Sequence, residues 1–219
     1  MRLEDVDVVG VFVVGDPRQE LARLMAAENP DLVFLGRHPS FEGRSGWGTS
    51  GLKLVREIAC STLVVPEGSS VDLSCVVVGM DFSSDAIAGL KVACAIAGHV
   101  DAVFQYDLRD VATGAMTDVE FHDHFTHNAV RHFHEVILEQ LEGDVQPVLA
   151  VVEGPNATTA LVEVARGAPI VVGSRGMSPM AAALLGSVAE RTAGRSDGPV
   201  LIVRDKTEQL GLLQALVHR

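Results

Sequence analysis

Short runs of aliphatic and β-branched residues alternate along this chain with segments in which apolar residues recur at helical spacing. Helical patterns begin near residues 16, 50, 84, 126, 157 and 186. The strand-like runs between them are residues 8–14, 31–36, 61–65, 74–83, 101–108, 145–154, 169–173 and 199–204. Strands that alternate with helices are typical of right-handed βαβ units. We therefore expect an α/β fold with an open, mostly parallel sheet and helices on both faces.

Two of the helical segments carry recognisable start signals. Asp16 can act as an N-cap with Pro17 at the first helical position, and Ser83 or Ser84 can cap a later helix. The first of these helices has a stripe of three apolar residues, Leu21, Leu24 and Met25. The spacing of the stripe predicts one buried face on this helix.

The first 67 residues repeat part of the later sequence. Three pairs of residues match at a constant offset of 137 positions: Gly36 with Gly173, Ser50 with Ser187, and Val64 with Leu201. The segment GDPRQELARLMAAENPDLVFLG is similar to EGPNATTALVEVARGAPIVVG. Nothing before residue 8 supplies the first half of the repeated unit, so residues 1–67 are predicted to be a partial module without its first two strands.

The other boundaries follow from composition. Residues 68–72 lie in a segment rich in Pro, Gly, Ser and Asp, and we interpret them as a linker. Residues 73–205 then form a complete module. Residues 206–219 have leucines at helical spacing, which predicts a packed helical tail.

The segment VVGSRGMSPMAAALLGSVAE, residues 171–190, has the composition of a ligand-binding loop. Gly173 and Gly176 let the backbone approach a ligand closely, and Gly186 with Ser187 begins a helix whose first N–H groups and dipole favour an anion. Asp81 ends another strand and suits a ribose hydroxyl or an exocyclic amine. The residues alone predict an anion or nucleotide site, with a glycine-containing connection and a serine cap as the alternative.

Residues 73–205 resemble the universal stress protein family over nearly their full length. Nucleotide-binding members carry the pattern Gly-x2-Gly-x9-Gly-Ser/Thr, which Gly173, Gly176, Gly186 and Ser187 match. The segment VVVGMDFS, which contains Asp81, resembles the first strand of the family. The resemblance implies a Rossmann-like, five-stranded parallel sheet of order 3-2-1-4-5, and dimer-like pairing through the fifth strand.

The same resemblance implies where a ligand would lie. ATP, with or without Mg²⁺, would lie across Asp81, the two-glycine loop and the Gly-Ser helix start. Val172 and Val188 match positions that contact the ligand through their backbone. The N-terminal copy departs from the pattern, because Pro39 and Thr49 replace the second and third glycines. We expect this copy to bind no nucleotide and to supply a strand-five partner for the complete module.

Composition narrows the class of protein. A formal net charge of −12 argues against a general nucleic-acid binder or a binder of anionic membranes. No apolar run is long enough to span a bilayer and no secretory leader is recognised, so a soluble cytoplasmic protein is expected. The three cysteines, Cys60, Cys75 and Cys94, are too few and too scattered for a disulfide or zinc framework. Cys75 and Cys94 lie in apolar periodic segments and are interpreted as buried reduced thiols.

Five histidines lie between residues 122 and 134. His124, His127 and His134 share one face of a helix, a spacing that could ligate a transition metal. Arg131 on the same face would repel a cation. A solvated or interface face is therefore the favoured interpretation, and a metal site in the His122–His134 segment is the alternative.

The sequence contains no recognisable pairing of a nucleophile with a general base. Arg175 could reach a phosphate or lie at the surface. We therefore expect a homodimeric stress-response protein that binds an adenine nucleotide, with ATP as its ligand, and that is regulatory, or at most a slow ATPase. The alternative from another class is a dimerisation scaffold of the same fold that binds no nucleotide.

Overall fold

The computed structural model describes residues 7–38, 55–56, 58, 60–107, 118–175 and 185–204 of the 219-residue chain. Two compact units make up the chain, residues 1–30 and residues 31–219. Gly176, most of the helix expected near residue 50, and the tail expected at 206–219 lie outside the described residues.

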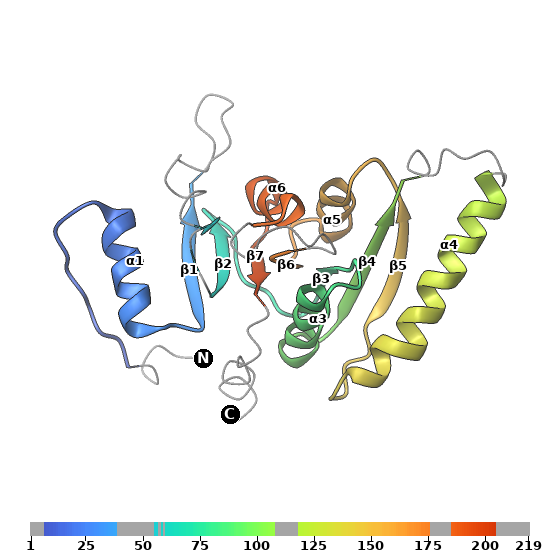
Figure 1. Cartoon of the computed structure of the whole chain (residues 1–219), viewed down its shortest axis with the longest axis horizontal. Helices are drawn as coiled ribbons and strands as arrows, with labels where there is room; N and C mark the ends of the chain where they lie inside the picture. The colour runs from blue at the N-terminus through green and yellow to red at the C-terminus, as the bar shows by residue number, and fades with distance from the viewer. Residues whose placement is uncertain are drawn as a thin grey trace. The chain divides into compact units, whose positions relative to one another are not determined.

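A seven-stranded sheet forms the centre of the larger unit, in the order β1-β2-β7-β6-β3-β4-β5 (Figure 1). The strands are β1 (Leu32–Arg37), β2 (Ser61–Pro66), β3 (Val76–Gly79), β4 (Val100–Tyr106), β5 (Val148–Glu153), β6 (Ile170–Gly173) and β7 (Val200–Val203). Neighbouring strands are parallel except for β2 and β7. Strands β3 to β7 follow the expected order 3-2-1-4-5, while β1 and β2 extend the sheet beyond the five strands predicted.

Helices cover both faces of this sheet. α5 and α6 lie side by side over one face, and α3 with the η3 turn that continues α4 packs on the other (Figure 1). Their bounds are α3 (Ser84–Ile96), α4 (Asp118–His132), η3 (Phe133–Ile137), η4 (Leu138–Gln140), α5 (Ala157–Ala165) and α6 (Ser187–Arg195). Among the described residues, no helix is both long and apolar enough to cross a membrane.

α4 begins at Asp118, earlier than the helical pattern near residue 126 predicts. The sequence of α4 is polar, so it does not indicate the contacts that hold this helix on the sheet. The ring of Phe125 stacks on Tyr106 of β4 at 6.0 Å, and His132 meets the ring of Phe82 edge-on at 4.9 Å. These aromatic contacts are tertiary, so hydrophobic periodicity did not reveal them.

The smaller unit contains α1 (Pro17–Glu28), which begins as its cap signals predict. The side chain of Asp16 accepts hydrogen bonds from the backbone N–H groups of Arg18 and Gln19, at 3.1 and 3.0 Å. The helix ends at Asn29, whose backbone is left-handed with φ of 44°. The predicted stripe of Leu21, Leu24 and Met25 is half-buried.

β2 and β7 join the two copies of the repeat. Their antiparallel register pairs Thr62 with Ile202, Leu63 with Leu201, and Val64 with Val200. The repeat makes Leu63 equivalent to Val200, and Val64 equivalent to Leu201. Replacing each residue by its equivalent converts the pair Leu63–Leu201 into the pair Val200–Val64, so the register is unchanged. The two strands are therefore related by local two-fold symmetry, and the expected strand-five partnership is confirmed within a single chain.

The N-terminal strands share a hydrophobic core with the complete module. Val64 of β2 is fully buried in a cluster that also holds Ile202 of β7, Leu161 of α5 and Ala189 of α6. Leu35 of β1 packs against the same cluster. The two copies therefore bury apolar surface against each other. Such burial is the main source of stability.

The strand predicted at residues 8–14 is absent, and this prediction was wrong. Residues 7–14 have no strand pairing, and the side chains of Val8 and Phe12 are 76% and 92% exposed. The corresponding strand of the complete module is β5, which pairs only with β4. Among the described residues of the N-terminal copy no strand corresponds to β4, so an apolar run of the right composition has no ladder to join.

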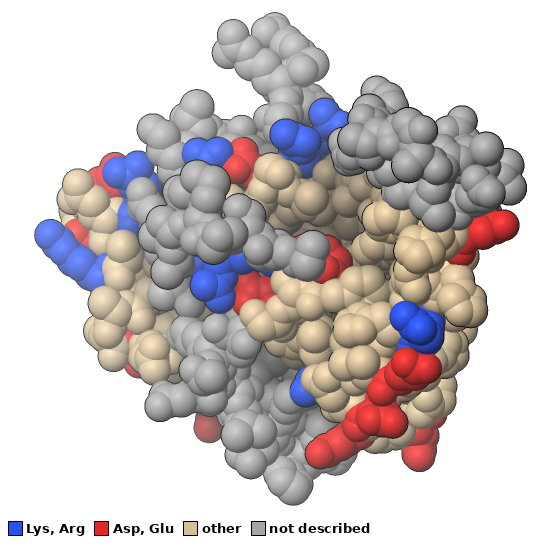
Figure 2. Space-filling model, turned by 45° about the vertical axis from the view of Figure 1, so that its right-hand side comes forward, with Lys and Arg blue, Asp and Glu red and all other residues tan. Residues whose placement is uncertain are grey.

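The excess of acidic over basic residues is visible at the surface. Figure 2 shows acidic side chains gathered over the lower right of one face, while the lysines and arginines in view lie scattered. The formal net charge of the whole sequence is −12. Carboxylates are therefore a prominent feature of the face drawn there.

Val64→Ala tests whether β2 is part of the main core. Removing two methyl groups from this fully buried position should lower the free energy of unfolding by about 2 kcal/mol. Phe34→Ala on β1 removes a side chain that is 66% exposed, and should change it by about 0.5 kcal/mol or less. Urea unfolding measures both, and equal effects would contradict a core shared by the two copies.

Candidate functional site

The candidate site lies at the carboxyl ends of β3 and β6, two adjacent parallel strands. Their register pairs Val77 with Ile170 and Val78 with Val171. Asp81 follows β3 and Gly173 ends β6, so both reach the same edge of the sheet, as the sequence predicts. The chain continues from β3 to β4 on one side and from β6 to β7 on the other. Such a switch point is where open α/β sheets bind ligands.

Asp81 is held by the turn that begins α3. Its Oδ1 accepts hydrogen bonds from the backbone N–H of Ser83 at 3.0 Å and from Ser83 Oγ at 2.5 Å. Between them Phe82 has a left-handed backbone, with φ of 62°. The side chain of Ser83 also caps α3 by accepting the N–H of Ala86. Among the described residues nothing donates to Oδ2 of Asp81, so this half-buried oxygen is available at the edge.

A buried ionic network lies directly beside this turn. Asp85, in the first turn of α3, is only 1% exposed. Its Oδ2 accepts from Ser174 Oγ at 2.7 Å, from the backbone N–H of Arg175 at 3.0 Å and from Arg175 Nε at 3.1 Å. A terminal nitrogen of Arg175 donates to Oδ1 at 3.1 Å. The carboxylate of Asp85 therefore accepts hydrogen bonds from both residues that follow β6, from the side chain of Ser174 and from the backbone and side chain of Arg175.

The sequence suggested that Arg175 reaches a phosphate or lies at the surface, but this network gives it a different role. Its guanidinium forms a two-pronged pair with Asp85, a geometry that favours arginine. The pair compensates a carboxylate that would be costly to bury alone. This pair could not be predicted from the sequence, because the two residues are 90 positions apart. An acidic residue in the first turn of a helix was the only local signal.

Arg204 is a second cation at this edge that the sequence analysis missed. It follows β7, and a terminal nitrogen lies 3.5 Å from the carbonyl oxygens of Val55 and Arg56. Burial lowers the pKa of Arg204, the charge of Arg175 lowers it further, and the charge of Asp85 opposes both. The edge therefore holds two arginines of which Arg175 is already engaged by Asp85.

Gly173 is required for packing at this edge. A Cβ at this position would lie 2.9 Å from the backbone nitrogen of Ala86 and from the Cβ and carbonyl carbon of Asp85. The start of α3 therefore rests directly on the end of β6. At its counterpart in the N-terminal copy, Gly36, no atom of the described residues lies within 4 Å of such a Cβ. Close packing therefore requires a glycine at position 173, whereas no described contact requires one at position 36.

Gly186 is the N-cap of α6 and closes the loop that follows β6. Its N–H donates to the carbonyl oxygen of Ser174 at 2.7 Å, so this N–H is already used. α6 has no side-chain cap. In the described part of the chain, the N–H groups of Ser187, Val188 and Ala189 have no acceptor. The donors expected at this helix start are therefore those after Gly186.

The N-terminal copy holds α6 near both ends. Arg37 of β1 donates to the carbonyl oxygen of Gly194 at 2.9 Å and to that of Ser196, at the end of the helix. Burial lowers the pKa of Arg37, opposed by the charge of Asp197. At the other end, Arg56 forms a two-pronged pair with Glu190, at 2.7 to 3.1 Å. The partial module thus contributes directly to positioning the helix at the site.

The remaining predicted residues have separate places. Val172 is 2% exposed in β6, where its side chain joins the core and only its backbone could face a ligand. Ser187 and Val188 are exposed in the first turn of α6. Gly176 lies outside the described residues, so its role stays a prediction.

Two histidines of α4 have different hydrogen-bond partners. His122 Nδ1 hydrogen-bonds with the hydroxyl of Tyr106, and His124 Nε2 lies 2.8 Å from Nδ2 of Asn128. Among the described residues, no three of these histidines bring ring nitrogens together. The structure therefore does not form the three-ligand site that their helical spacing permits.

The sheet order and the position of this edge define a doubly wound, Rossmann-like α/β protein. The model of the universal stress protein family matches residues 1–66 and 75–204, which is most of the chain. The chain belongs to the universal stress protein family. Among curated proteins, no match is found.

Two solved structures with TM-scores of 0.64 and 0.61 agree on the fold. A protein of unknown function from Pseudomonas aeruginosa is 15% identical with a TM-score of 0.64, and the match covers 94% of this chain and 74% of that protein. A universal stress protein from Archaeoglobus fulgidus is 21% identical with a TM-score of 0.61, and covers 90% and 70%. A universal stress protein in complex with cAMP is 27% identical with a TM-score of 0.42, and covers 60% and 97%.

Gly173→Ala tests the close contact between β6 and α3. The added methyl would lie 2.9 Å from backbone atoms, so it should lower the free energy of unfolding by about 1–3 kcal/mol. Gly36→Ala is the matched control, because its methyl would enter open space, and should change it by about 0.5 kcal/mol or less. Equal losses in urea unfolding would rule out close packing as the reason for Gly173.

A double-mutant cycle tests the pair formed by Asp85 and Arg175. Each single change to alanine leaves the other partner without its ion pair, so the two losses should not add. We expect a coupling energy of about 1 kcal/mol or more from the unfolding free energies of the four proteins. The matched cycle is Arg56→Ala with Glu190→Ala, a more exposed pair expected to couple by less than about 1 kcal/mol. Strict additivity at Asp85 and Arg175 would show that the pair does not anchor the loop.

Proposed function

We propose that this protein binds an adenine nucleotide, with ATP as its ligand, at the carboxyl edge of β3 and β6. One chain of contacts carries the proposal. Ser83 Oγ, which donates to Asp81, also lies 3.4 Å from the carbonyl oxygen of Arg175, and Gly186 donates to the adjacent Ser174. The Asp81 turn, the residues after β6 and the start of α6 therefore surround a single point of the fold.

The donors at this edge fit the phosphates of a nucleotide. The N–H groups of Ser187 and Val188 lie in the first turn of a helix without a side-chain cap. Unpaired N–H groups and the helix dipole together favour an anion at such a place. The Ser187 hydroxyl can add a donor, and Arg204 adds positive charge nearby. A bound Mg²⁺ would supply further compensation of phosphate charge.

The acceptors at the same edge fit the nucleoside part. Asp81 keeps Oδ2 for a ribose hydroxyl or an exocyclic amine, because its turn uses only Oδ1. The backbone of Val172 and Gly173 lies at the end of β6, where a ligand at the switch point would contact it. Gly176, in the matching sequence pattern, is assigned to the same loop.

We assign a regulatory role to the bound nucleotide. The polar groups of the two residues after β6 are engaged in holding this edge together, because Ser174 and Arg175 both donate to Asp85. These residues therefore position the edge, and nucleotide binding would stabilise the arrangement of the loop and α6. Any ATP hydrolysis is expected to be slow.

A dimerisation scaffold is the second candidate. The apolar side chains of residues 8–14 are exposed, and Phe34 on the edge strand β1 is 66% exposed. Exposed apolar side chains and an edge strand with an open side each favour a partner. We propose a second copy of this chain as that partner, so the protein would be a homodimer with or without nucleotide.

Calorimetric titration of the full chain with ATP, with and without Mg²⁺, tests the nucleotide proposal. The wild-type protein should release heat on binding. Asp81→Asn keeps Oδ1 for the Ser83 turn but removes the negative charge, and Ser187→Ala removes one donor. Each should weaken binding about tenfold, the effect of losing one hydrogen bond to a charged group.

Asp72→Asn is the matched control for Asp81→Asn. Asp72 Oδ1 also accepts the N–H of the serine two positions on, Ser74, at 2.9 Å, but it precedes β3 instead of following it. It should leave ATP affinity unchanged. If millimolar ATP gives no heat with the wild-type protein, the nucleotide proposal is wrong. A dimeric mass by light scattering in that case would favour the scaffold.

A further inference from the structure

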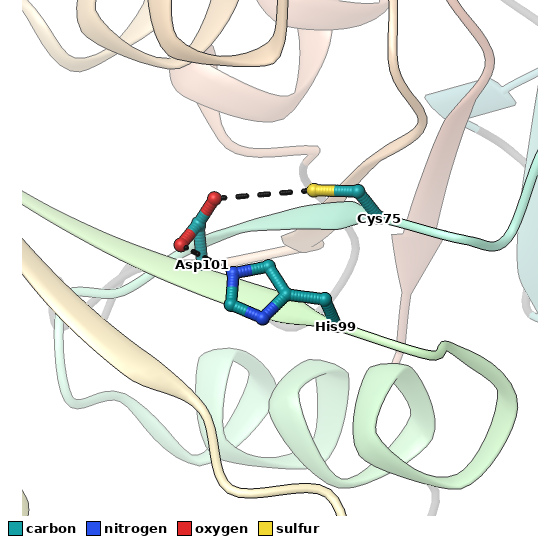
Figure 3. A group of neighbouring side chains, drawn as sticks. All are labelled: Cys75, His99 and Asp101. Carbon is teal, nitrogen blue, oxygen red and sulfur yellow. Dashed lines mark hydrogen bonds and ion pairs between the residues drawn. The ribbon is translucent and has the colours of Figure 1, made fainter.

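A second polar cluster lies at the opposite, amino-terminal end of the central strands. It consists of Cys75, which precedes β3, His99, which precedes β4, and Asp101, the second residue of β4 (Figure 3). The nucleotide edge lies at the carboxyl ends of the same sheet. The cluster is therefore independent of the proposed function.

The register of the sheet brings these three side chains together. β3 and β4 are parallel with Val76 opposite Val100, so Cys75 lies beside His99. His99 and Asp101 are two residues apart and therefore point to the same face of the sheet. The N–H of Val76 donates to the carbonyl oxygen of His99 at 3.0 Å, which fixes the two backbones at this point.

The ligand atoms are close to the spacing that a metal ion requires. His99 Nε2 lies 3.0 Å from Asp101 Oδ1, and Cys75 Sγ lies 3.9 Å from Asp101 Oδ2 (Figure 3). One ligand atom from each residue lies within 4.8 Å of the other two. Tetrahedral zinc with ordinary bond lengths places its ligands about 3.3–3.6 Å apart. Small side-chain rotations would therefore bring all three onto one ion.

The arrangement does not match a cysteine nucleophile. A catalytic thiol needs a histidine as its base, but here the thiol and the imidazole both contact the same carboxylate of Asp101. The pKa of the Cys75 thiol is raised by burial, by the carboxylate and hydrogen bond of Asp101, and by the charge of Asp72. This thiol is less ionised than an ordinary one in the absence of a cation.

The same surroundings favour a divalent cation. The carboxylates of Asp101 and Asp72 raise the local negative charge, and a metal ion would reverse their effect on the thiol by binding the thiolate. The side chains of His99 and Asp101 are 50% and 31% exposed, so an ion can enter from solvent. Asp101 is also held in the ladder between β3 and β5. Cys75 is half-buried, whereas its apolar segment predicted a buried thiol.

We propose that Cys75, His99 and Asp101 bind a divalent transition-metal ion of the zinc type. Thiolate, imidazole and carboxylate are the three ligand types that zinc takes from proteins. Three protein ligands leave the fourth position to water or an external ligand. On binding, the sulfur–metal bond replaces the S–H bond, and the proton of Cys75 is released to solvent.

Cobalt(II) titration of the reduced full-length protein tests the site directly. The wild-type protein should develop the near-ultraviolet absorption of a thiolate bound to cobalt. Zn²⁺ should displace the cobalt and release about one proton per ion in weakly buffered solution. Cys75→Ser should abolish the absorption. His99→Gln and Asp101→Asn should weaken binding by at least about tenfold, because loss of even an outer-shell partner costs that much.

The double variant with His124→Gln and His127→Gln is the matched control. It removes the exposed histidines of α4 and leaves the cluster intact, so its cobalt spectrum and zinc affinity should equal those of the wild type. Circular dichroism of each variant shows whether it is folded. The proposal is wrong if the thiolate band is absent from the folded wild-type protein, if Cys75→Ser retains it, or if only the α4 double variant loses metal binding.

Discussion

The buried carboxylate of Asp85 is the constraint on which this edge of the molecule depends. A carboxylate that is 1% exposed must be compensated, and Ser174 and Arg175 do so with four hydrogen bonds. The contact requires α3 to approach β6 so closely that only glycine fits at position 173. Ser174 then receives Gly186, which begins α6. The Asp81 turn, the two residues after β6 and the start of α6 are therefore positioned through one ion pair.

The N-terminal copy has a structural role in this arrangement. Its strand β2 pairs with β7 by local two-fold symmetry, and its apolar residues join the core under α5 and α6. Arg37 and Arg56 hold the two ends of α6, the helix that presents its first N–H groups at the candidate site. The N-terminal copy thus completes the surroundings of the candidate site on the other module. The strand pairing expected from the family is made here within one chain.

Much of the fold could be predicted because it depends on local pattern. The caps at Asp16 and Ser83 lie where they were expected, and the five strands of the complete module have the expected order. The prediction at residues 8–14 was wrong because a strand also needs a partner, which composition does not reveal. Gly173 and Gly186 were proposed for the candidate site from their spacing, and Asp81 from its place after a strand. Asp85 and Arg204 could not, because their importance depends on contacts with residues far away in the sequence.

The sequence by itself determined the order of strands and helices, the repeat, and the glycine pattern at the candidate site, since these follow from neighbouring residues and their periodicity. Tertiary structure decided what each polar residue does. It paired Arg175 with Asp85, used the N–H of Gly186 to close the loop, and brought Cys75 beside His99 and Asp101. The physical reason is that ion pairs, close packing and metal-ligand geometry depend on distances in space. Those distances are set only when the parallel strands align in register.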